Sequence, residues 1–227
     1  MIKPVILLHG ALGAAAQLKP LKGALEERGR KVYTINFSGH GGVPFSEKGF
    51  GIDVFADDVF NFLGQEQIQT VDIFGYSMGG YVALWMAHQH PDRVNKIITL
   101  GTKFDWDPAS AGKEIAKLDP EKIQTKVPAF ARILEHRHAP NHWKELIART
   151  SEMMYQLGQK PMLTEQIFLS LTHSTQILLG DQDDMADLNY SKKVASLLPN
   201  GTFHMLQQTP HAIEKVSIEK LLASMGL

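Results

Sequence analysis

One serine lies in a pattern that would make its hydroxyl a nucleophile. The segment Gly75-Tyr76-Ser77-Met78-Gly79-Gly80 follows a short apolar run, and residues 81–87 then have the pattern of a helix. A serine hydroxyl reacts well only when it is exposed beside a base. A sharp strand-to-helix turn would expose the Ser77 oxygen above a sheet, and the flanking glycines would leave room for the neighbouring backbone. The pattern therefore predicts Ser77 as the nucleophile.

The base for this serine is predicted to be His211, one of ten histidines. His211 follows the apolar run Thr202–Leu206 and precedes a helical pattern. A loop that leaves the carboxyl end of a strand opens at the same edge of the sheet as Ser77, and open α/β sheets bind ligands at that edge. His204 is the main rival, but it lies inside the strand pattern and is interpreted as a strand residue hydrogen-bonded in place.

The acid that would orient His211 has several candidates. An apolar run ends at Gly180, and the turn that follows contains four carboxylates: Asp181, Asp183, Asp184 and Asp187. Each satisfies the chain order serine, aspartate, histidine, and their spacing alone does not separate them. Asp105 and Asp107 follow an earlier apolar run that opens on the same edge, and they are weaker alternatives.

The reaction also needs donors for a developing oxyanion. The N–H of Met78 would lie at the N-terminus of the helix after Ser77, where free amides favour negative charge. The second donor is expected to be the N–H of Ala11, in the turn His9-Gly10-Ala11-Leu12-Gly13 after the first apolar run. Donors of this kind typically stabilise the transition state by about 3 kcal/mol each.

The elements that must position these groups alternate along the chain. Several of the predicted strands are apolar throughout, as is typical of parallel strands covered on both faces. The six predicted strands are Val5–Leu8, Val32–Ile35, Val71–Phe74, Ile97–Leu100, Gln176–Leu179 and Thr202–Leu206. The predicted helices between and after them are Leu18–Arg28, Asp53–Leu63, Tyr81–His88, Ser191–Leu198 and Ala212–Ala223. This alternation predicts an α/β fold, with a mostly parallel sheet of about six strands covered by helices on both faces.

Residues 105–172 interrupt this alternation. They have no strand pattern, and prolines separate helix-like pieces. One apolar stripe at helical spacing contains Trp143, Leu146, Ile147, Thr150, Met154 and Leu157. We therefore expect a core built from residues 1–104 and 173–227, with residues 105–172 as a helical cap or lid insertion.

Composition excludes several classes of function. The formal net charge of -1 argues against a nucleic-acid surface, and the absence of cysteine excludes disulfides and thiolate metal sites. No stretch approaches the roughly 20 apolar residues that span a bilayer. We interpret Val5–Leu8 as a buried strand and not as part of a secretory signal. A cytoplasmic location is expected, and the oligomeric state is not determined.

Other polar clusters are interpreted as structural. His136, His138 and His142 lack a carboxylate or thiol at ligand spacing, so we interpret them as a solvated helix end and expect no metal. Residues 39–42 are rich in glycine but lack the lysine and hydroxyl residue of a phosphate-binding loop. No cofactor is expected.

Taken together, the chain resembles α/β-hydrolase-fold proteins of the small single-domain type with a helical cap. The resemblance is carried by Leu-Leu-His-Gly after the first strand, by the sequences at 38–42, 75–80 and 180–183, and by His211. It implies Asp183 as the acid, because the family's acid commonly follows the strand-ending glycine by three residues. It also implies that Ala11 and Met78 form the oxyanion hole and that His9 and His40 are structural.

The chain departs from the family pattern at two places. Met185-Ala186 replaces the usual valine-proline after the acid, and Asn36 stands where an aspartate is frequent.

We therefore predict a serine hydrolase that acts on a small acyl compound, most simply a carboxylic ester. Ser77, His211 and Asp183 would form its triad. One alternative is a carbon–carbon bond hydrolase or a lyase like those of menaquinone biosynthesis; such enzymes often use a lid arginine, for which the chain offers Arg132, Arg137 and Arg149. Another is a non-catalytic protein that binds a small ligand in the same pocket.

Overall fold

The centre of the molecule is a six-stranded sheet in which every pair of neighbouring strands is parallel. A computed structural model describes residues 3–226. The strands have the order β2-β1-β3-β4-β5-β6 and are β1 (Val5–Leu8), β2 (Val32–Thr34), β3 (Val71–Tyr76), β4 (Val94–Leu100), β5 (Ser174–Gln182) and β6 (Gly201–Pro210). The predicted parallel α/β fold is confirmed.

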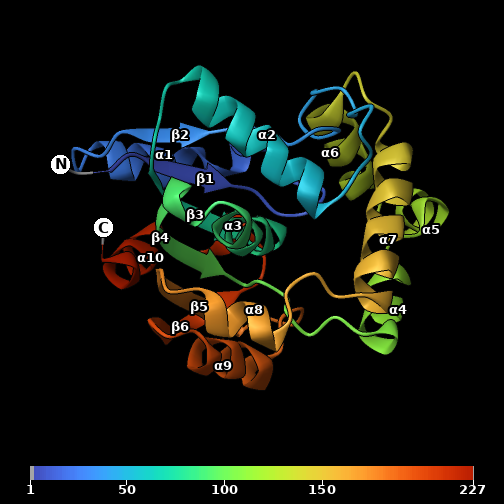
Figure 1. The fold of residues 1–227 in the computed structure, drawn as a ribbon. Helices are drawn as coiled ribbons and strands as arrows, with labels where there is room; N and C mark the ends of the chain where they lie inside the picture. Colours follow the sequence, from blue (N-terminus) through green and yellow to red (C-terminus); the bar gives the residue numbers. More distant parts are fainter. Residues whose placement is uncertain (1–2, 227) are drawn as a thin grey trace.

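Helices connect the strands and cover the sheet (Figure 1). Outside the insertion they are α1 (Lys19–Glu26), α2 (Ile52–Gln65), α3 (Met78–Gln89), α9 (Leu188–Leu197) and α10 (Ile218–Met225), with short 3-10 turns η1 (Ala15–Leu18), η2 (Pro91–Arg93) and η3 (Ile213–Lys215). Within residues 3–226 no helix combines the length and the apolarity needed to cross a membrane.

Each face of the sheet has its own apolar core. Val5 and Leu7 pack with α1 and α10, whereas Ile6 and Leu8 pack in the cluster that contains α2, α3 and α9. Successive side chains of a strand point to opposite faces, so a strand covered on both sides must be apolar throughout. This is why a central strand such as β1 could be recognised as a continuous apolar run.

Residues 105–172 are helical, as expected, and contain no strand. Their helices are α4 (Pro108–Ile115), α5 (Pro120–Lys126), α6 (Pro128–His138), α7 (Trp143–Gln159) and α8 (Glu165–Ser170). In Figure 1, α4 to α7 gather beyond the ends toward which the arrows of β1 and β4 point. The predicted apolar stripe lies on α7 and is buried. A third core joins the stripe to Leu12, at the carboxyl edge of the sheet.

Three buried histidines join this insertion to the sheet. The ring of His40 lies between those of His9 and His138, with centroid distances of 5.0 and 5.8 Å. Burial is the main cause that lowers the pKa of His9 and of His138 to about 4, and it holds the pKa of His40 well below its usual value. All three imidazoles are therefore neutral at pH 7, which avoids charge repulsion inside the joint.

Two predictions about the chain were wrong. The pattern over Ala212–Ala223 is not one helix: it is split into η3 and α10, because Ser217 caps a new helix by accepting a hydrogen bond from the amide of Lys220. His136 and His142 are exposed, as expected of a solvated helix end, but His138 is fully buried. Its two ring nitrogens form hydrogen bonds with the backbone of Gly41 and Leu12. These bonds satisfy the buried ring, although the polar residues beside it in the sequence had suggested an exposed position.

We expect these imidazoles to make the protein labile in mild acid. An unfolded histidine takes up a proton below pH of about 6.5, whereas folded His9 and His138 stay neutral down to about pH 4. The unfolded state therefore binds more protons between these two values. The free energy of unfolding should fall as the pH drops through this window, by about 1.4 kcal/mol per pH unit for each such histidine. Urea unfolding at a series of pH values measures this slope.

The His138 share of the slope can be isolated with a matched pair of variants. His138→Gln should flatten the slope between about pH 6.5 and 4 by the contribution of one histidine. His136→Gln, at an exposed position of the same helix, should leave it unchanged. Equal slopes for both variants and the parent protein would contradict the assignment.

Candidate active site

Ser77 lies at the junction of β3 and α3 with a strained backbone. Its φ and ψ are 51° and -117°, a region that costs a residue with a side chain on the order of 1 kcal/mol or more. Its N–H donates to the carbonyl of Leu100 over 2.8 Å. Its carbonyl accepts from the hydroxyl of Thr102 at 2.9 Å and from the amide of Gly80 at 3.0 Å. These three hydrogen bonds of the Ser77 backbone hold the turn between β3 and α3 in its strained conformation.

The glycines on either side of the serine are required by close backbone contacts. A Cβ on Gly75 would collide with the carbonyl of Gly79, and a Cβ on Gly79 would collide with the carbonyl of Leu8. The helix α3 therefore packs directly on strands β3 and β1. This close approach brings the serine turn beside the loop that follows β1.

His211 and Asp183 meet at the same edge of the sheet. The Nδ1 of His211 donates to Oδ2 of Asp183 over 2.8 Å, and the ring packs against Tyr76 with centroids 5.4 Å apart. The two residues come from the loops after β6 and β5. Gly101, which follows β4, has a φ of +60°, and a Cβ there would be 2.8 Å from Oδ2 of Asp183.

The competing carboxylates have other partners. Asp181 accepts from the amide of Thr209, and Asp105 pairs with Lys103 at 2.8 Å. Two more act as helix caps: Asp107 at the start of α4 and Asp187 at the start of α9. Asp184 lines the adjacent cavity. Of the six aspartates considered, the one that bonds to His211 in the described structure is Asp183.

The surroundings of Asp183 favour its ionised form. Burial would raise its pKa, but the hydrogen bond and charge of His211 and two backbone amides outweigh burial and hold the pKa below its usual value. These amides belong to Met185 and Ala186, which donate to Oδ1 over 2.9 and 3.0 Å. A proline at 186 would lack the second donor. The departure from the family's valine-proline therefore adds a hydrogen bond to the carboxylate.

Two free amides lie near the serine. Met78 is the first residue of α3, and Ala11 lies in a four-residue turn closed by the amide of Gly13 and the carbonyl of Gly10 at 3.0 Å. Neither the Met78 nor the Ala11 N–H donates in any hydrogen bond found among residues 3–226. A Cβ on Gly10 would lie 3.1 Å from that of Ser77, so this turn touches the serine.

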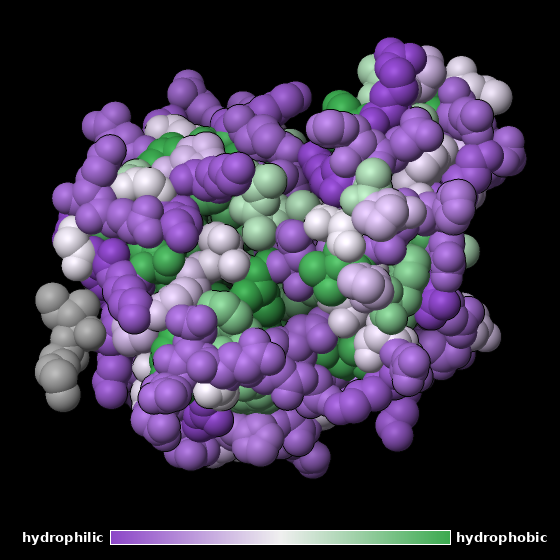
Figure 2. All heavy atoms as spheres, turned by 90° about the horizontal axis from the view of Figure 1, so that it is seen from above, coloured by the Kyte–Doolittle hydropathy of each residue, from purple (hydrophilic) through white to green (hydrophobic). Residues whose placement is uncertain are grey.

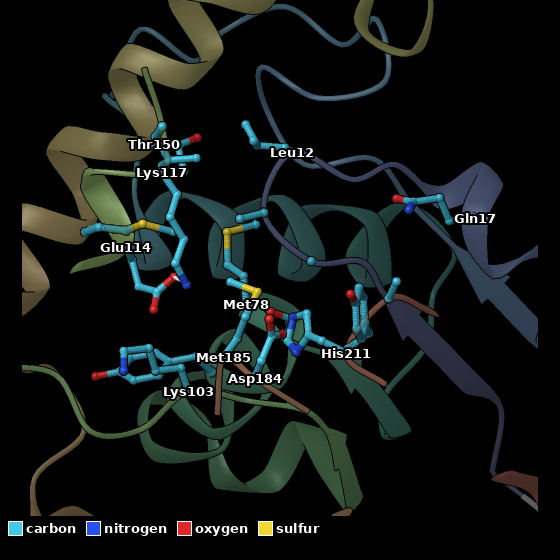
Figure 3. A pocket seen from close by; sticks show the side chains of 18 of the residues that line it. Leu12, Gln17, Met78, Lys103, Glu114, Lys117, Thr150, Asp184, Met185 and His211 are labelled. Atoms are coloured by element: carbon cyan, nitrogen blue, oxygen red, sulfur yellow. Dashed lines mark hydrogen bonds and ion pairs between the residues drawn. The ribbon is translucent and has the colours of Figure 1, made fainter. Parts of the chain in front are cut away.

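Ser77, His211, Ala11 and Met78 all line one cavity of about 850 Å³. The insertion supplies much of its apolar wall through Trp106, Leu118, Phe130, Met153, Met154 and Leu157. In Figure 2 the outer surface is mostly hydrophilic, and hydrophobic side chains show chiefly in its hollowed middle. Figure 3 shows Glu114, Lys117 and Thr150 on one side of the cavity, His211 on another side and Met78 between them.

The Ser77 hydroxyl and His211 line the same cavity but are not bonded to each other. Among the hydrogen bonds of residues 3–226, none joins the Ser77 hydroxyl to His211.

Several charged side chains of the cavity wall form ion pairs. Glu114, which is 7% exposed, pairs with Lys117 at 2.9 Å. Arg137 pairs with Glu214 at 3.4 Å. Lys103 also lines the cavity. It forms an ion pair with Asp105, which is not a lining residue. The buried part of the wall is therefore apolar with paired charges, whereas Asp184 and Lys215 line the cavity with exposed side chains and form no ion pair among residues 3–226.

Sequence reasoning missed the contacts of three residues near the site. These are Thr102, His138 and Arg137, the last of which was considered only as a residue that could bind a carboxylate. Thr102 lies just after an apolar strand, a weak signal for its bond to the Ser77 carbonyl. Arg137 and His138 bond to residues about 100 positions away or more, which no local pattern reveals. His204 lies in β6 as expected, but its side chain is exposed and makes no hydrogen bond among residues 3–226, so the prediction that it is hydrogen-bonded in place was wrong.

Sequence comparison places the chain among known proteins. A family model described as the alpha/beta hydrolase fold matches residues 3–146. The sn-1-specific diacylglycerol lipase ABHD11 of Danio rerio is 34% identical over 98 residues, which are 43% of this chain and 31% of that protein. A pimeloyl-acyl-carrier-protein methyl ester esterase of Neisseria meningitidis is 36% identical over 97 residues, which are 42% of this chain and 35% of that protein. The chain thus spans about a third of the length of these curated relatives.

Solved structures share the whole fold at low identity. A structure from work on carboxylesterases of Nitrososphaera gargenis has a TM-score of 0.81 at 16% identity and covers 99% of this chain and 89% of its own. The enol-lactonase of Burkholderia xenovorans has a TM-score of 0.78 at 15% identity, with coverages of 100% and 93%. Since the family model also covers more than half of the chain, this protein belongs to the α/β hydrolase fold family.

Proposed function

We propose that the protein is a serine hydrolase that cleaves a small acyl compound, most simply a carboxylic ester. One observation carries the proposal: the hydrogen bond between His211 and Asp183 lies at the cavity that the strained Ser77 also lines. The ester-cleaving relatives support it over the matched part of their length.

In the proposed reaction the Ser77 oxygen attacks the acyl carbon. Because Nδ1 of His211 is bound to Asp183, Nε2 is the nitrogen that accepts the serine proton. The amides of Ala11 and Met78 would hold the oxyanion. When the bond to the alcohol breaks, the same proton leaves with the alcohol. Water then attacks the acyl-enzyme and gives a proton to Nε2. The bond between the acyl carbon and the Ser77 oxygen breaks, the acid leaves, and Nε2 returns the proton to that oxygen.

The absence of a hydrogen bond between Ser77 and His211 in the described structure is compatible with this role. Catalytic hydrogen bonds are often long in ligand-free enzymes and shorten when substrate binds. Asp183 would keep the ring in the tautomer that leaves Nε2 free and would stabilise the imidazolium. Its lowered pKa keeps it ionised for this task.

We also propose that residues 105–172 act as the lid of the site. They supply apolar wall residues such as Trp106 and Met154, and they bury Leu12 of the loop that carries Ala11. A lid of this kind excludes water from the acyl-enzyme and sets the shape of the acyl pocket. A neutral acyl chain suits the paired charges of the wall.

The first test is covalent labelling. A fluorophosphonate probe should modify Ser77, and Ser77→Ala should abolish labelling and lower kcat/KM for a p-nitrophenyl ester by roughly 10⁴-fold or more, because no other nucleophile replaces the serine. Ser196→Ala, at an exposed serine of α9, should label and react like the parent protein. Peptide mapping by mass spectrometry identifies the adduct. Labelling at another residue, or labelling that persists in Ser77→Ala, would end the proposal.

The second test concerns the Asp183–His211 pair. Gly101→Ala would push a methyl group toward both side chains, with Cβ 2.8 Å from Oδ2 of Asp183 and 3.2 Å from Nδ1 of His211. Displacement of a catalytic ring by a fraction of an ångström should lower kcat by about 10- to 100-fold. Gly112→Ala is the control, because nothing lies within 4 Å of its Cβ. Steady-state kinetics measures kcat for both variants. Equal kcat values would refute the catalytic role of the Asp183–His211 pair.

The third test separates ester hydrolysis from cleavage of carbon–carbon bonds in carboxylated substrates. Enzymes that catalyse such cleavage often use a lid arginine that is free to hold a substrate carboxylate. Of Arg132, Arg137 and Arg149, the one that lines the cavity is Arg137, and it already bonds to the Leu12 carbonyl at 2.9 Å and to Glu214. We expect kcat/KM for neutral p-nitrophenyl esters to exceed that for vinylogous diketo acids by at least about tenfold, because an unpaired carboxylate is costly to bury. The opposite order would favour the carbon–carbon reaction.

A further inference from the structure

Leu12 occupies a backbone conformation that normally belongs to glycine. It is the third residue of the turn Gly10–Gly13 and has a φ of 55°. In a turn of this kind a positive φ at the third position strains any residue with a Cβ. Leu12 is nevertheless 8% exposed and packs among apolar residues of the insertion. The turn that carries Ala11 is therefore held in a strained conformation by contacts with residues outside the turn.

The outside contacts come from two consecutive residues at the end of α6. The carbonyl of Leu12 accepts from Nη1 of Arg137 over 2.9 Å and from Nε2 of His138 over 3.0 Å. The other ring nitrogen of His138 accepts from the amide of Gly41 over 3.0 Å, which fixes the tautomer with its proton on Nε2. Two donors, one of them charged, thus meet on a single carbonyl oxygen.

Arg137 also reaches the segment that follows His211. Its Nη2 lies 3.4 Å from Glu214 Oε1, and the same oxygen accepts from Gln17 over 2.5 Å. Arg137 is also one of the residues that line the active-site cavity. One side chain of the insertion therefore bonds to the loop after β1 and to the loop after β6.

From these contacts we propose that Arg137 and His138 are positioning residues that hold the Leu12 carbonyl, and through it the Ala11 amide, in the geometry for oxyanion binding. Without them Leu12 would relax toward a negative φ and the Ala11–Leu12 peptide would rotate. The turn from Gly10 to Gly13 would then change shape, and the Gly10–Ala11 peptide, which carries the Ala11 N–H, would move with it. The oxyanion donor would then be in place only when α6 is docked on the core. This inference rests on the proposed function, because it concerns the donor for that reaction.

A merely structural role for the two residues predicts a different result. If the bonds only attached α6 to the core, their loss would lower stability and change substrate affinity through the cavity wall. Loss of a donor used in the transition state lowers kcat with KM nearly unchanged. The strain at Leu12 gives a second distinction, because glycine adopts a positive φ without help.

The experiment measures Arg137→Met in three backgrounds. Leu12→Ala and Leu12→Gly both remove the leucine side chain, but only alanine keeps the strain. With a p-nitrophenyl ester, Arg137→Met should lower kcat by about tenfold in the parent protein and in Leu12→Ala, and by less than about threefold in Leu12→Gly, with KM within about twofold throughout. Arg137→Lys, which keeps a donor, should retain an intermediate kcat. His136→Gln on the exposed face of α6 is the control and should match the parent protein.

The outcomes separate the inference from the proposed function. Parent protein that neither hydrolyses the ester nor labels at Ser77 would overturn both. Active, labelled parent protein with equal losses in the alanine and glycine backgrounds, or with losses in KM and not in kcat, would overturn the inference alone. Thermal unfolding of every variant identifies any that is unfolded at the assay temperature. If Arg137→Met is unfolded, the comparison is made with Arg137→Lys, whose loss should likewise be smaller beside Leu12→Gly than beside Leu12→Ala.

Discussion

The strained peptide at Ser77 is the constraint on which the arrangement of the site depends. A φ of 51° turns the chain abruptly from β3 into α3, and the bonds from Leu100, Gly80 and Thr102 hold it there. The turn is possible only because Gly79 lets the helix rest on the backbone of β1. The same contact that exposes the serine therefore also fixes the distance to the loop after β1.

The insertion is fastened to this edge by uncharged imidazoles and by one charged guanidinium. Neutral His138 can donate and accept at once, so it joins the Leu12 carbonyl to the Gly41 amide in a space from which water is excluded. Arg137 stays at the border of the cavity, where Glu214 balances its charge. A buried joint of this kind is stable only while its rings remain unprotonated. Attachment of the insertion and geometry of the site thus share the same bonds.

Local sequence patterns predicted the sheet well because strands covered on both faces must be apolar throughout, as Val5–Leu8 is. They also predicted the serine turn, since its glycines are demanded by contacts within a few residues. Asp183 needed the family pattern, because four carboxylates share one turn and only the fold decides which faces His211. The role of His138 was out of reach, because its partner Leu12 lies 126 positions away. The spacing of apolar residues along the chain indicates which residues are buried locally. Hydrogen bonds between residues far apart in the sequence do not produce such a spacing.

The turn after β5 has a consequence for how acid would affect the chemistry. Asp183 is held by the imidazole and by two amides, one of which exists because residue 186 is alanine and not an imino acid. A carboxylate bound this firmly stays charged in moderately acidic solution. Moderate acid would therefore leave the Asp183 side of this pair intact, and the carboxylate would go on fixing the tautomer and orientation of the ring.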